Sequence, residues 1–257
     1  MTTPSSSPTG DGATKKVPTA RIDKLLGSLG YGSRTEVARL GRVGGIVLDG
    51  VELIDVSKRI PVTPDLPERM QVDGRPLDPP AGLVRMLNKP LGMTCSRKEE
   101  GALVYDVLPS RWRRRDPAIS TIGRLDKQTT GLLLLTDDGD LLHRVISPRR
   151  HVAKVYRAVL ARPLVGTEQA VFEAGGLVLE GEDKPLAPAV LEVLSPTEAR
   201  LTVTEGRYHM VRRMFAAVGN HVEDLHRERV GALALPDDLA LGEWRLLTPA
   251  EIDLIFA

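Results

Sequence analysis

The sequence predicts an α+β protein built from a small N-terminal unit and a larger, strand-rich region. Two observations predict this division. Two short helical patterns and a hairpin signal fill the first part of the chain, and a proline-rich stretch then separates them from a series of short apolar or alternating runs that are typical of strands. The length of 257 residues suits one or two domains of about 150 residues each.

We expect four segments along the chain. Residues 1–17 are rich in Ser, Thr, Pro and Gly and contain almost no large apolar side chains, which predicts a disordered tail. The helices and the hairpin occupy 18–76, and prolines mark a linker over 77–83. The remaining residues, 84–257, form the strand-rich domain.

Local signals define the N-terminal unit. Apolar residues at helical spacing over 21–29 predict a first helix. Ser33 followed by Glu36 is a capping-box pattern that opens a second helix. Apolar runs at 46–48 and 51–54, joined by Asp-Gly, predict a β-hairpin with a type I′ turn.

In the larger region, strands are interrupted by occasional helices. Short apolar or alternating runs predict strands at 83–87, 132–136, 152–160, 188–194 and 199–204. Helical spacing and capping residues predict helices through 141–145, over 208–218 and from Thr248 onward. This mixture is the basis for the α+β class.

Composition excludes several classes of protein. A hydrophobic fraction of 42% and a charged fraction of 27% are ordinary globular values, which argue against a wholly disordered, collagen-like or coiled-coil chain. The single cysteine, Cys95, cannot form an internal disulfide, which fits a reducing cytosol. No apolar run approaches the ~18 residues of a membrane span, and the N-terminus lacks the apolar stretch of a signal peptide. We therefore expect a cytoplasmic protein that has no membrane partner.

Positive charge is concentrated in blocks, although the formal net charge is only +1. Basic side chains cluster over 21–42, 111–115 and 141–166, whereas acidic residues gather over 65–78 and 180–183. Guanidinium groups in such blocks are suited to binding phosphate. A polyanion such as a nucleic acid is therefore the leading class of partner.

Metal ions and nucleotide cofactors are not indicated. The five histidines have no cysteine cluster or His-Glu helix motif around them, which argues against zinc. The aspartates within 137–140 lack the remaining ligands of a calcium loop. No glycine-rich phosphate loop occurs either. We expect a protein that uses no metal and no cofactor.

Polar residues adjoin an apolar strand at 123–132, GRLDKQTTGL. An aspartate beside an arginine in a loop ordinarily caps or solvates a turn, so the residue types alone do not make Asp126 functional. The whole stretch, however, resembles the signature loop of the pseudouridine synthases, in which GRLD precedes a polar turn and an apolar strand reading TGLLLLT. This resemblance implies a cofactor-free RNA isomerase.

The resemblance covers nearly all of the chain after the tail. Residues 21–73 look like an S4-type RNA-binding domain, and 87–90, LNKP, look like the opening of the catalytic domain in the RsuA branch of these enzymes. Residues 205–229 and the closing GEWRLLTPAEI are similar to C-terminal motifs of the same branch. The resemblance implies a small S4-like domain followed by a catalytic domain with a mixed or antiparallel sheet.

The resemblance also implies roles for residues of the catalytic domain. Asp126 matches the essential catalytic aspartate, and Arg124 matches the arginine that fills the gap left by the extruded base. Tyr156, in AKVYRA, matches the tyrosine that packs on that base and whose hydroxyl assists proton transfer. Lys89 and Pro90 match the opening motif, and we expect them to give structural support.

A carboxylate in a water-poor pocket stays ionised beside a cation, and the resemblance places that cation in the segment HMVRRM. Two arginines compete for the position. At 100° per residue, Arg212 borders the apolar face centred on Val211, whereas Arg213 points to solvent. We therefore expect Arg212 to partner Asp126 as a catalytic residue, and Arg213 to contact phosphate. Met210 replaces the glutamine usual in the family, which argues against RNA contact by that side chain.

Isomerisation of uridine breaks the N1 glycosidic bond and forms a bond to C5, so the base must leave the stack, rotate and reattach. The rest of a folded RNA is recognised mainly by its backbone and shape. Basic residues near the N-terminal helices and in the basic run of the larger region are the expected RNA contacts: Arg21, Lys24, Arg34, Arg39, Arg42, Arg149 and Arg150.

The resemblance to the RsuA branch implies that the substrate is small-subunit (16S) ribosomal RNA, free or within an assembly intermediate. Two alternatives remain open from the sequence. One is a synthase of the same family that acts on large-subunit ribosomal RNA, and the other is a non-catalytic RNA-binding factor of ribosome assembly. We expect the protein to be a monomer.

Overall fold

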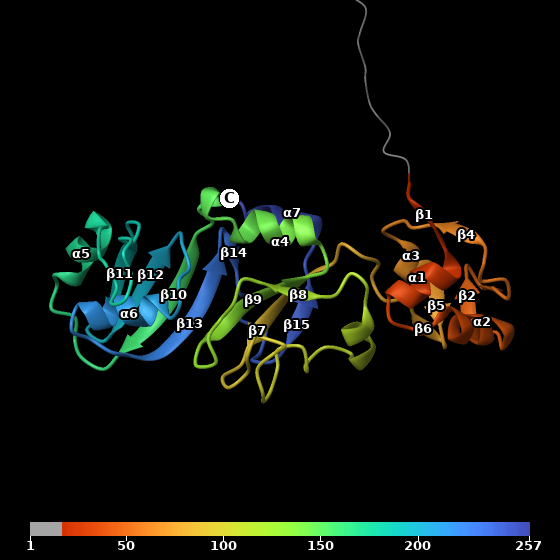
Figure 1. Cartoon of the computed structure of the whole chain (residues 1–257), viewed down its shortest axis with the longest axis horizontal. Coiled ribbons are helices and arrows are strands. Elements are labelled where there is room, and N and C mark those ends of the chain that lie inside the picture. Colours follow the sequence, from red (N-terminus) through yellow and green to blue (C-terminus); the bar gives the residue numbers. More distant parts are fainter. Residues whose placement is uncertain (1–16) are drawn as a thin grey trace, which may run out of the picture. The chain divides into compact units, whose positions relative to one another are not determined.

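The computed structural model describes residues 17–257, so all of the expected tail over 1–17 except Val17 falls outside the described residues. Two compact units make up the chain (Figure 1). The first consists of the residues up to 27 together with 31–80, and the second of 28–30 together with 81–257. Both units combine helices with sheets, which confirms the predicted α+β class.

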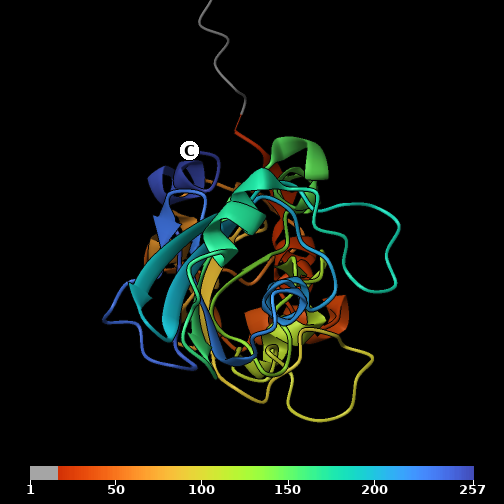
Figure 2. The same cartoon turned by 90° about the vertical axis from the view of Figure 1, so that its left-hand side faces the viewer.

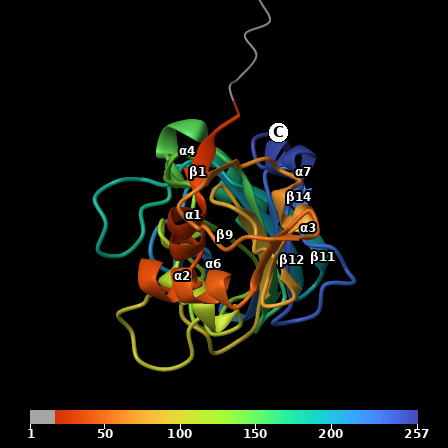
Figure 3. The ribbon, with the colours of Figure 1, turned by 90° about the vertical axis from the view of Figure 1, so that its right-hand side faces the viewer.

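The first unit consists of short helices and small sheets. Its elements are β1 (Thr19–Arg21), α1 (Ile22–Ser28), α2 (Arg34–Arg42), β2 (Ile46–Leu48), β3 (Val51–Glu52), β4 (Arg59–Pro61), α3 (Leu66–Arg69), β5 (Met70–Val72) and β6 (Arg75–Pro76). β1 pairs with β4, and a second sheet has the strand order β3-β2-β5-β6. Figure 3 shows α1, α2 and α3 of this unit.

The capping box and the hairpin turn predicted for the first unit are both present in the structure. The Ser33 hydroxyl accepts the N–H of Glu36 at 3.3 Å and the Glu36 carboxylate accepts the N–H of Ser33 at 2.7 Å, which confirms the capping box of α2. In the β2–β3 hairpin, Asp49 and Gly50 have φ of 51° and 79°, as a type I′ turn requires. The apolar side chains that gave α1 its helical spacing are buried.

The second unit is built on one nine-stranded sheet. Its strands are β7 (Val84–Lys89), β8 (Ser120–Ile122), β9 (Thr130–Thr136), β10 (Lys154–Leu160), β11 (Val190–Ser195), β12 (Glu198–Val203), β13 (Val222–Val230), β14 (Leu233–Ala234) and β15 (Trp244–Leu246). The strand order is β11-β12-β10-β13-β9-β7-β15, with β14 paired to β13 and β8 paired to β9. All pairs are antiparallel except β13 with β9, so the sheet is mixed, as expected.

Helices pack against two regions of this sheet. They are α4 (Gly139–Ile146), α5 (Glu168–Ala174), α6 (Met210–Ala217) and α7 (Pro249–Leu254), with short 3₁₀ turns η1 (Ser110–Arg114) and η2 (Pro148–Arg150). Buried side chains of α5 and α6 form one core with β10, β11 and β12, and those of α4 form a second core with β7 and β9. None of the helices in 17–257 has the length and apolar composition needed to cross a bilayer.

Strand β9 carries the apolar run TGLLLLT at the centre of the sheet. Leu132 and Leu134 belong to the core that includes α4, whereas Leu133 and Leu135 belong to a different cluster that contains Trp112. Because alternate residues of a strand point to opposite faces, both faces of β9 are buried. The loop that precedes β9 therefore starts from a rigid position in the middle of the unit.

Two long loops leave the second unit on the same side, one over 91–102 (yellow) and one over 175–188 (cyan), as Figures 2 and 3 show from opposite directions. Glu99 of the first loop lines the cavity described below. Glu182 of the second loop forms an ion pair with Arg207, another residue of the cavity wall. Both loops thus contribute to the surroundings of one site.

Candidate active site

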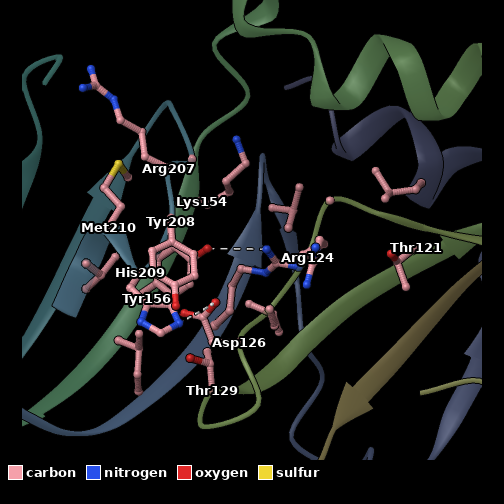
Figure 4. Close-up of a pocket in the computed structure, with 18 of the residues that line it drawn as sticks. Thr121, Arg124, Asp126, Thr129, Lys154, Tyr156, Arg207, Tyr208, His209 and Met210 are labelled. Carbon is pink, nitrogen blue, oxygen red and sulfur yellow. Dashed lines mark hydrogen bonds and ion pairs between the residues drawn. The ribbon is translucent and has the colours of Figure 1, made fainter. Parts of the chain in front are cut away.

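A cavity of about 920 Å³ lies between the loop over 121–129, strands β10 and β13, and the residues that lead into α6 (Figure 4). Its volume suits a ligand of nucleotide size. All of the residues that line it belong to the second unit. Five cationic side chains and two carboxylates are among them, so the cavity favours a negatively charged ligand.

The loop over 123–129 joins β8 to the centre of the sheet and carries Asp126. Its turn is closed by the N–H of Thr129, which donates to the Asp126 carbonyl at 3.0 Å. Gly131 follows with φ of 102°, and a Cβ there would lie 2.4 Å from the Arg227 carbonyl of the neighbouring strand. Only glycine allows this close approach of β9 to β13. The glycine of the motif therefore fixes where the loop enters the sheet.

The Asp126 side chain is 34% exposed and points toward His209, whose Nε2 lies 3.6 Å from Asp126 Oδ1 (Figure 4). His209 precedes α6 in the left-handed conformation, with φ of 48°. Its ring stacks on Tyr208 with 3.9 Å between the ring centroids and an interplanar angle of 13°. Tyr208 is 76% exposed. The carboxylate therefore has an imidazole beside it and an exposed phenol ring beyond that.

Tyr156 reaches the same cavity from β10. It lies opposite Arg227 in the pairing of β10 with β13, and Arg227 Nη1 donates to the Tyr156 hydroxyl at 3.4 Å. Arg227 is only 3% exposed, and its Nε donates to the Leu132 carbonyl at 2.7 Å. Figure 4 shows Tyr156 beside Asp126 and His209. Two of the three predicted catalytic residues, Asp126 and Tyr156, thus line one cavity.

Lys89 is wholly buried beside the end of the loop. Its Nζ donates to the Pro90 carbonyl at 3.0 Å and to the Thr129 carbonyl at 2.8 Å. Burial lowers the pKa of Lys89, while the nearby Cys95 thiol and Asp126 carboxylate act against that shift. These contacts tie the end of β7 to the loop, which is the kind of support that we expect from Lys89 and Pro90.

The expected ion pair between Arg212 and Asp126 is absent from the described residues, and this expectation is corrected. Arg212 Nη1 donates to the Val222 carbonyl at 2.7 Å, and Nη2 donates to the Gln128 carbonyl at 2.8 Å. A planar guanidinium donates in several directions at once, so it bridges backbone groups of two segments. Arg212 therefore holds the loop two residues beyond Asp126 and does not contact its carboxylate.

The position of Arg213 also differs from the prediction, which had its side chain point to solvent and contact phosphate. Its guanidinium pairs with Glu182 and donates to the Glu180 carbonyl. Arg207 pairs with the same Glu182 at 2.6 Å, and together the two arginines lower the pKa of that carboxyl. The helical spacing placed Arg213 away from the core, but the acidic loop over 175–188 folds back to meet it.

Arg124 lies on the wall of the cavity, and its side chain is 67% exposed. Its guanidinium pairs with Glu99 at 2.9 Å. Glu99 also accepts the Thr94 hydroxyl at 2.6 Å. An exposed ion pair contributes only about 0–1 kcal/mol. Breaking the Arg124–Glu99 pair therefore costs little free energy.

The other predicted RNA contacts lie on the surface. Arg21 forms an ion pair with Asp23 at 2.7 Å in the first unit. The remaining members of the set are exposed, four on α1 or α2 and two in η2: Lys24, Arg34, Arg39, Arg42, Arg149 and Arg150. Their charges are accessible to a polyanion.

The cavity brings together four side chains that the sequence did not single out as site residues: Lys154, Tyr208, His209 and Arg227. Lys154 was expected only as a member of the basic block over 141–166. Three of the four occur inside the segment 205–229 that carried the resemblance. Their proximity to Asp126 depends on the pairing of β10 with β13 and on the left-handed conformation at His209. Spacing along the chain signals neither feature.

This arrangement is equipped for acid–base or nucleophilic chemistry on a planar ligand. It combines a half-buried carboxylate, an imidazole and a phenol hydroxyl. Aromatic rings at the cavity offer faces on which a nucleobase stacks. Within the part of the chain that the structure describes, no group of three His, Cys, Asp or Glu side chains is placed to hold a metal ion.

Comparison with known proteins finds relatives along most of the chain. Residues 84–217 match the family model described as RNA pseudouridylate synthase. Ribosomal small subunit pseudouridine synthase A of Escherichia coli (strain K12) is 42% identical over 237 residues, which cover 90% of this chain and 98% of that protein. The protein of the same name from Yersinia pestis is 44% identical over 236 residues, or 90% of this chain and 96% of that protein. A crystal structure of pseudouridylate synthase is 34% identical, with a TM-score of 0.63, and the match covers 91% of this chain and 99% of that one.

Proposed function

The chain belongs to the RNA pseudouridylate synthase family, and from this premise we propose that it isomerises a specific uridine of small-subunit (16S) ribosomal RNA to pseudouridine. The observation that carries the proposal is the half-buried Asp126 carboxylate, which lies with Tyr156 in a cavity of nucleotide size. The names of the Escherichia coli and Yersinia pestis relatives support the small ribosomal subunit as the source of the substrate. The substrate is free ribosomal RNA or an assembly intermediate.

The proposed reaction balances without a cofactor. The C1′–N1 bond of uridine breaks, the base rotates, and a C1′–C5 bond forms, while the C5 hydrogen leaves as a proton and N1 gains a proton. We assign the cleavage step to Asp126, which acts on the ribose or the pyrimidine. The Tyr156 ring packs on the base, and its hydroxyl, held by Arg227, assists the proton transfer.

Extrusion of the uridine costs a few kcal/mol, which contacts in the cavity offset. In this proposal Arg124 leaves Glu99 and fills the gap in the RNA stack. Arg212 acts as a positioning residue that holds the loop through the Gln128 carbonyl. Lys89 supports the same loop by donating to the Thr129 carbonyl.

The first unit serves, in the proposal, as an S4-like RNA-binding domain over 18–76, joined by the linker 77–83 to the catalytic domain over 84–257. Exposed cations on α1 and α2 suit contact with RNA backbone, and so do Arg149 and Arg150 in η2. Arg213 is no longer part of this set, because it pairs with Glu182. We infer a cytoplasmic monomer that works without cofactors.

Pseudouridine mapping of ribosomal RNA tests the proposal. Small- and large-subunit RNAs are treated with the wild-type protein, with Asp126→Asn or with the control Asp140→Asn, which changes an exposed residue of α4. Carbodiimide modification and primer extension then locate the product. We expect one site in small-subunit RNA with the wild type and the control, and none with Asp126→Asn, whose RNA binding is retained.

The other outcomes separate the alternatives. A site in large-subunit RNA alone would support a synthase for that subunit. Tight binding by the wild type without product under single-turnover conditions would support a non-catalytic assembly factor. Product formed by Asp126→Asn would remove Asp126 from the chemistry.

A further inference from the structure

We propose that Lys154 and Arg227 form an anion subsite of the cavity, which binds a phosphate group of the extruded nucleotide. The inference rests on the proposed function, because that function supplies the nucleotide. It extends the site beyond the residues that act on the base. It gives a specific role to Lys154, which the sequence places only within the basic block over 141–166, and to Arg227.

Both cations are neighbours of Tyr156, Lys154 in the same strand and Arg227 in the adjacent strand. Lys154 precedes Tyr156 by two residues in β10, so the two side chains share a face and start about 7 Å apart along the strand. Tyr156 lies opposite Arg227 in β13. All three side chains line the cavity. A ligand that packs on the Tyr156 ring therefore lies close to both cations.

Neither cation has an acidic partner in the described part of the chain. Lys154 Nζ donates to the Val152 carbonyl at 2.9 Å. Arg227 donates to the Leu132 carbonyl and, at a long 3.4 Å, to the Tyr156 hydroxyl. Its Nη2 has no hydrogen-bond partner among the described residues, although Arg227 is only 3% exposed. A buried donor without a partner is uncommon and costs free energy.

The two charges also repel each other. Burial lowers the pKa of Lys154, and the nearby Arg227 guanidinium lowers it further. Inside a protein the local dielectric constant is low, so repulsion between two positive charges is only weakly screened. An anion that contacts both groups offsets this repulsion. It also accepts hydrogen bonds that water would accept from the two cations if they were exposed.

Other cations of the cavity wall are already neutralised or solvated. Arg124 pairs with Glu99, and Arg207 pairs with Glu182. Lys127 is exposed to solvent. The partly buried positive charge that lacks a counter-ion is therefore concentrated at Lys154 and Arg227.

A phosphate group matches this pair better than a carbonyl oxygen of uracil. It carries a full negative charge and several acceptor oxygens, so it accepts from an ammonium and a guanidinium together. In RNA the ribose links every base to a phosphate on each side. A nucleotide whose base packs on Tyr156 thus brings a phosphate toward the neighbouring position of the strand, where Lys154 lies.

Methylphosphonate substitution tests the subsite. Substrate RNAs carry one neutral methylphosphonate in place of the phosphate on the 5′ or the 3′ side of the target uridine. With the wild type, we expect one of the two substitutions to slow single-turnover isomerisation at subsaturating enzyme by about 10- to 100-fold. Lys154→Met causes a similar loss with unmodified RNA and is insensitive to that methylphosphonate. Lys98→Met, which removes an exposed lysine outside the cavity wall, stays as sensitive as the wild type.

The pattern of losses decides the proposal. If neither methylphosphonate slows the wild type, or if the losses from Lys154→Met and from the methylphosphonate multiply, the subsite is wrong. Circular dichroism and thermal melting confirm that Lys154→Met is folded, and the test does not depend on a variant of the buried Arg227.

A binding measurement separates this inference from the proposed function. Calorimetry compares uridine 5′-monophosphate and uridine 3′-monophosphate with uridine. We expect the wild type to bind one of the two monophosphates more tightly than uridine, and Lys154→Met to bind all three equally. A wild type that binds neither monophosphate more tightly than uridine would overturn the subsite. A wild type that prefers a monophosphate but makes no pseudouridine in any ribosomal RNA would overturn the proposed function and leave the subsite standing.

Discussion

The ammonium group of Lys89 donates to the Thr129 carbonyl at 2.8 Å and so joins the last residue of β7 to the last residue of the loop that carries Asp126. A second contact lies close by, because the N–H of Gly92 donates to the Lys127 carbonyl at 2.9 Å. Lys89 and Gly92 thus hold the loop at two points, Thr129 and Lys127, within the turn that begins at Asp126. The position of the carboxylate depends on residues more than thirty positions earlier in the chain.

Replacement of Lys89 by Met should impair the loop more than the fold. The variant leaves the Pro90 and Thr129 carbonyls without a buried donor, which we expect to lower the free energy of unfolding by about 1–3 kcal/mol. A displaced Asp126 should lower the single-turnover rate on the order of 100-fold. Urea denaturation and rate measurements check both effects, with the exposed Lys98→Met as the control. An unchanged rate would show that the loop keeps its position without Lys89.

A second prediction distinguishes the two possible roles of Arg212. In the structure its two Nη groups bridge the Gln128 and Val222 carbonyls, so Arg212→Lys keeps the charge but loses the planar bridge. We expect the isomerisation rate of this variant to fall on the order of 100-fold while RNA affinity is retained. If the lysine variant keeps most of the rate, a positive charge near Asp126 is what matters, and the ion pair expected from the sequence describes the working enzyme better than the bridge does.

Much of the fold could be predicted because the signals are local. The capping boxes at Ser33 and Thr248 and the Asp-Gly turn at Asp49 depend on residues within a few positions of each other, and the structure contains all three. The apolar run of β9 predicted a buried strand because both of its faces are covered. These features need no knowledge of the rest of the chain.

The site was predicted only in part because its geometry is not local. The helix expected over 208–218 begins at Met210, since the preceding His209 adopts a left-handed conformation that turns its ring toward Asp126. Helical spacing gives the direction of Arg213 from its own helix. It cannot show that a loop over 175–188 brings Glu182 to that side chain.

Tyr208 provides a third prediction, because its exposed ring extends the stack that begins at His209. Stacking of a base on an aromatic side chain contributes about 1–3 kcal/mol. We expect Tyr208→Ala to weaken the binding of substrate RNA by that amount, whereas Tyr208→Phe and Tyr208→Trp retain binding. Fluorescence of 2-aminopurine placed beside the target uridine should be quenched by the wild type and by the aromatic variants but not by the alanine variant. Equal quenching by all four proteins would exclude a stacking role.

Asp137 and Arg115 support a fourth prediction, on stability. Asp137 Oδ2 accepts from Arg115 Nη2 at 2.8 Å with both side chains 1% exposed, and Oδ1 accepts the N–H groups of Gly82 and Leu83. Asp137→Ala leaves a buried guanidinium without this carboxylate, and we expect it to reduce the free energy of unfolding by about 3–5 kcal/mol. Chemical denaturation measures the loss.

The matched control removes an exposed acidic partner. Glu192 pairs with Arg200 at 2.7 Å, but its side chain is 59% exposed, so Glu192→Ala should cost no more than about 1 kcal/mol. Comparable losses from the buried and the exposed variant would contradict the importance of burial for the Asp137 pair.

The last prediction concerns pH and the helix α7. The Arg245 guanidinium, 2.6 Å away, and the N–H of Thr248, 2.8 Å away, lower the pKa of Glu251 from 4.5 to about 2. Because the folded state binds this proton less tightly than the unfolded state, the stabilisation by Glu251 is complete above pH 4.5 and is lost as the pH falls toward 2. We expect Glu251→Gln to lower the free energy of unfolding by about 1 kcal/mol at pH 7, with a difference from the wild type that shrinks below pH 4.5. Thermal melts across this range measure the effect, and Asp253→Asn, an exposed substitution on the same helix, serves as the control. A Glu251→Gln effect that stays constant from pH 7 to pH 3 would mean that the capping box stabilises α7 through the shape of the side chain and not through its charge.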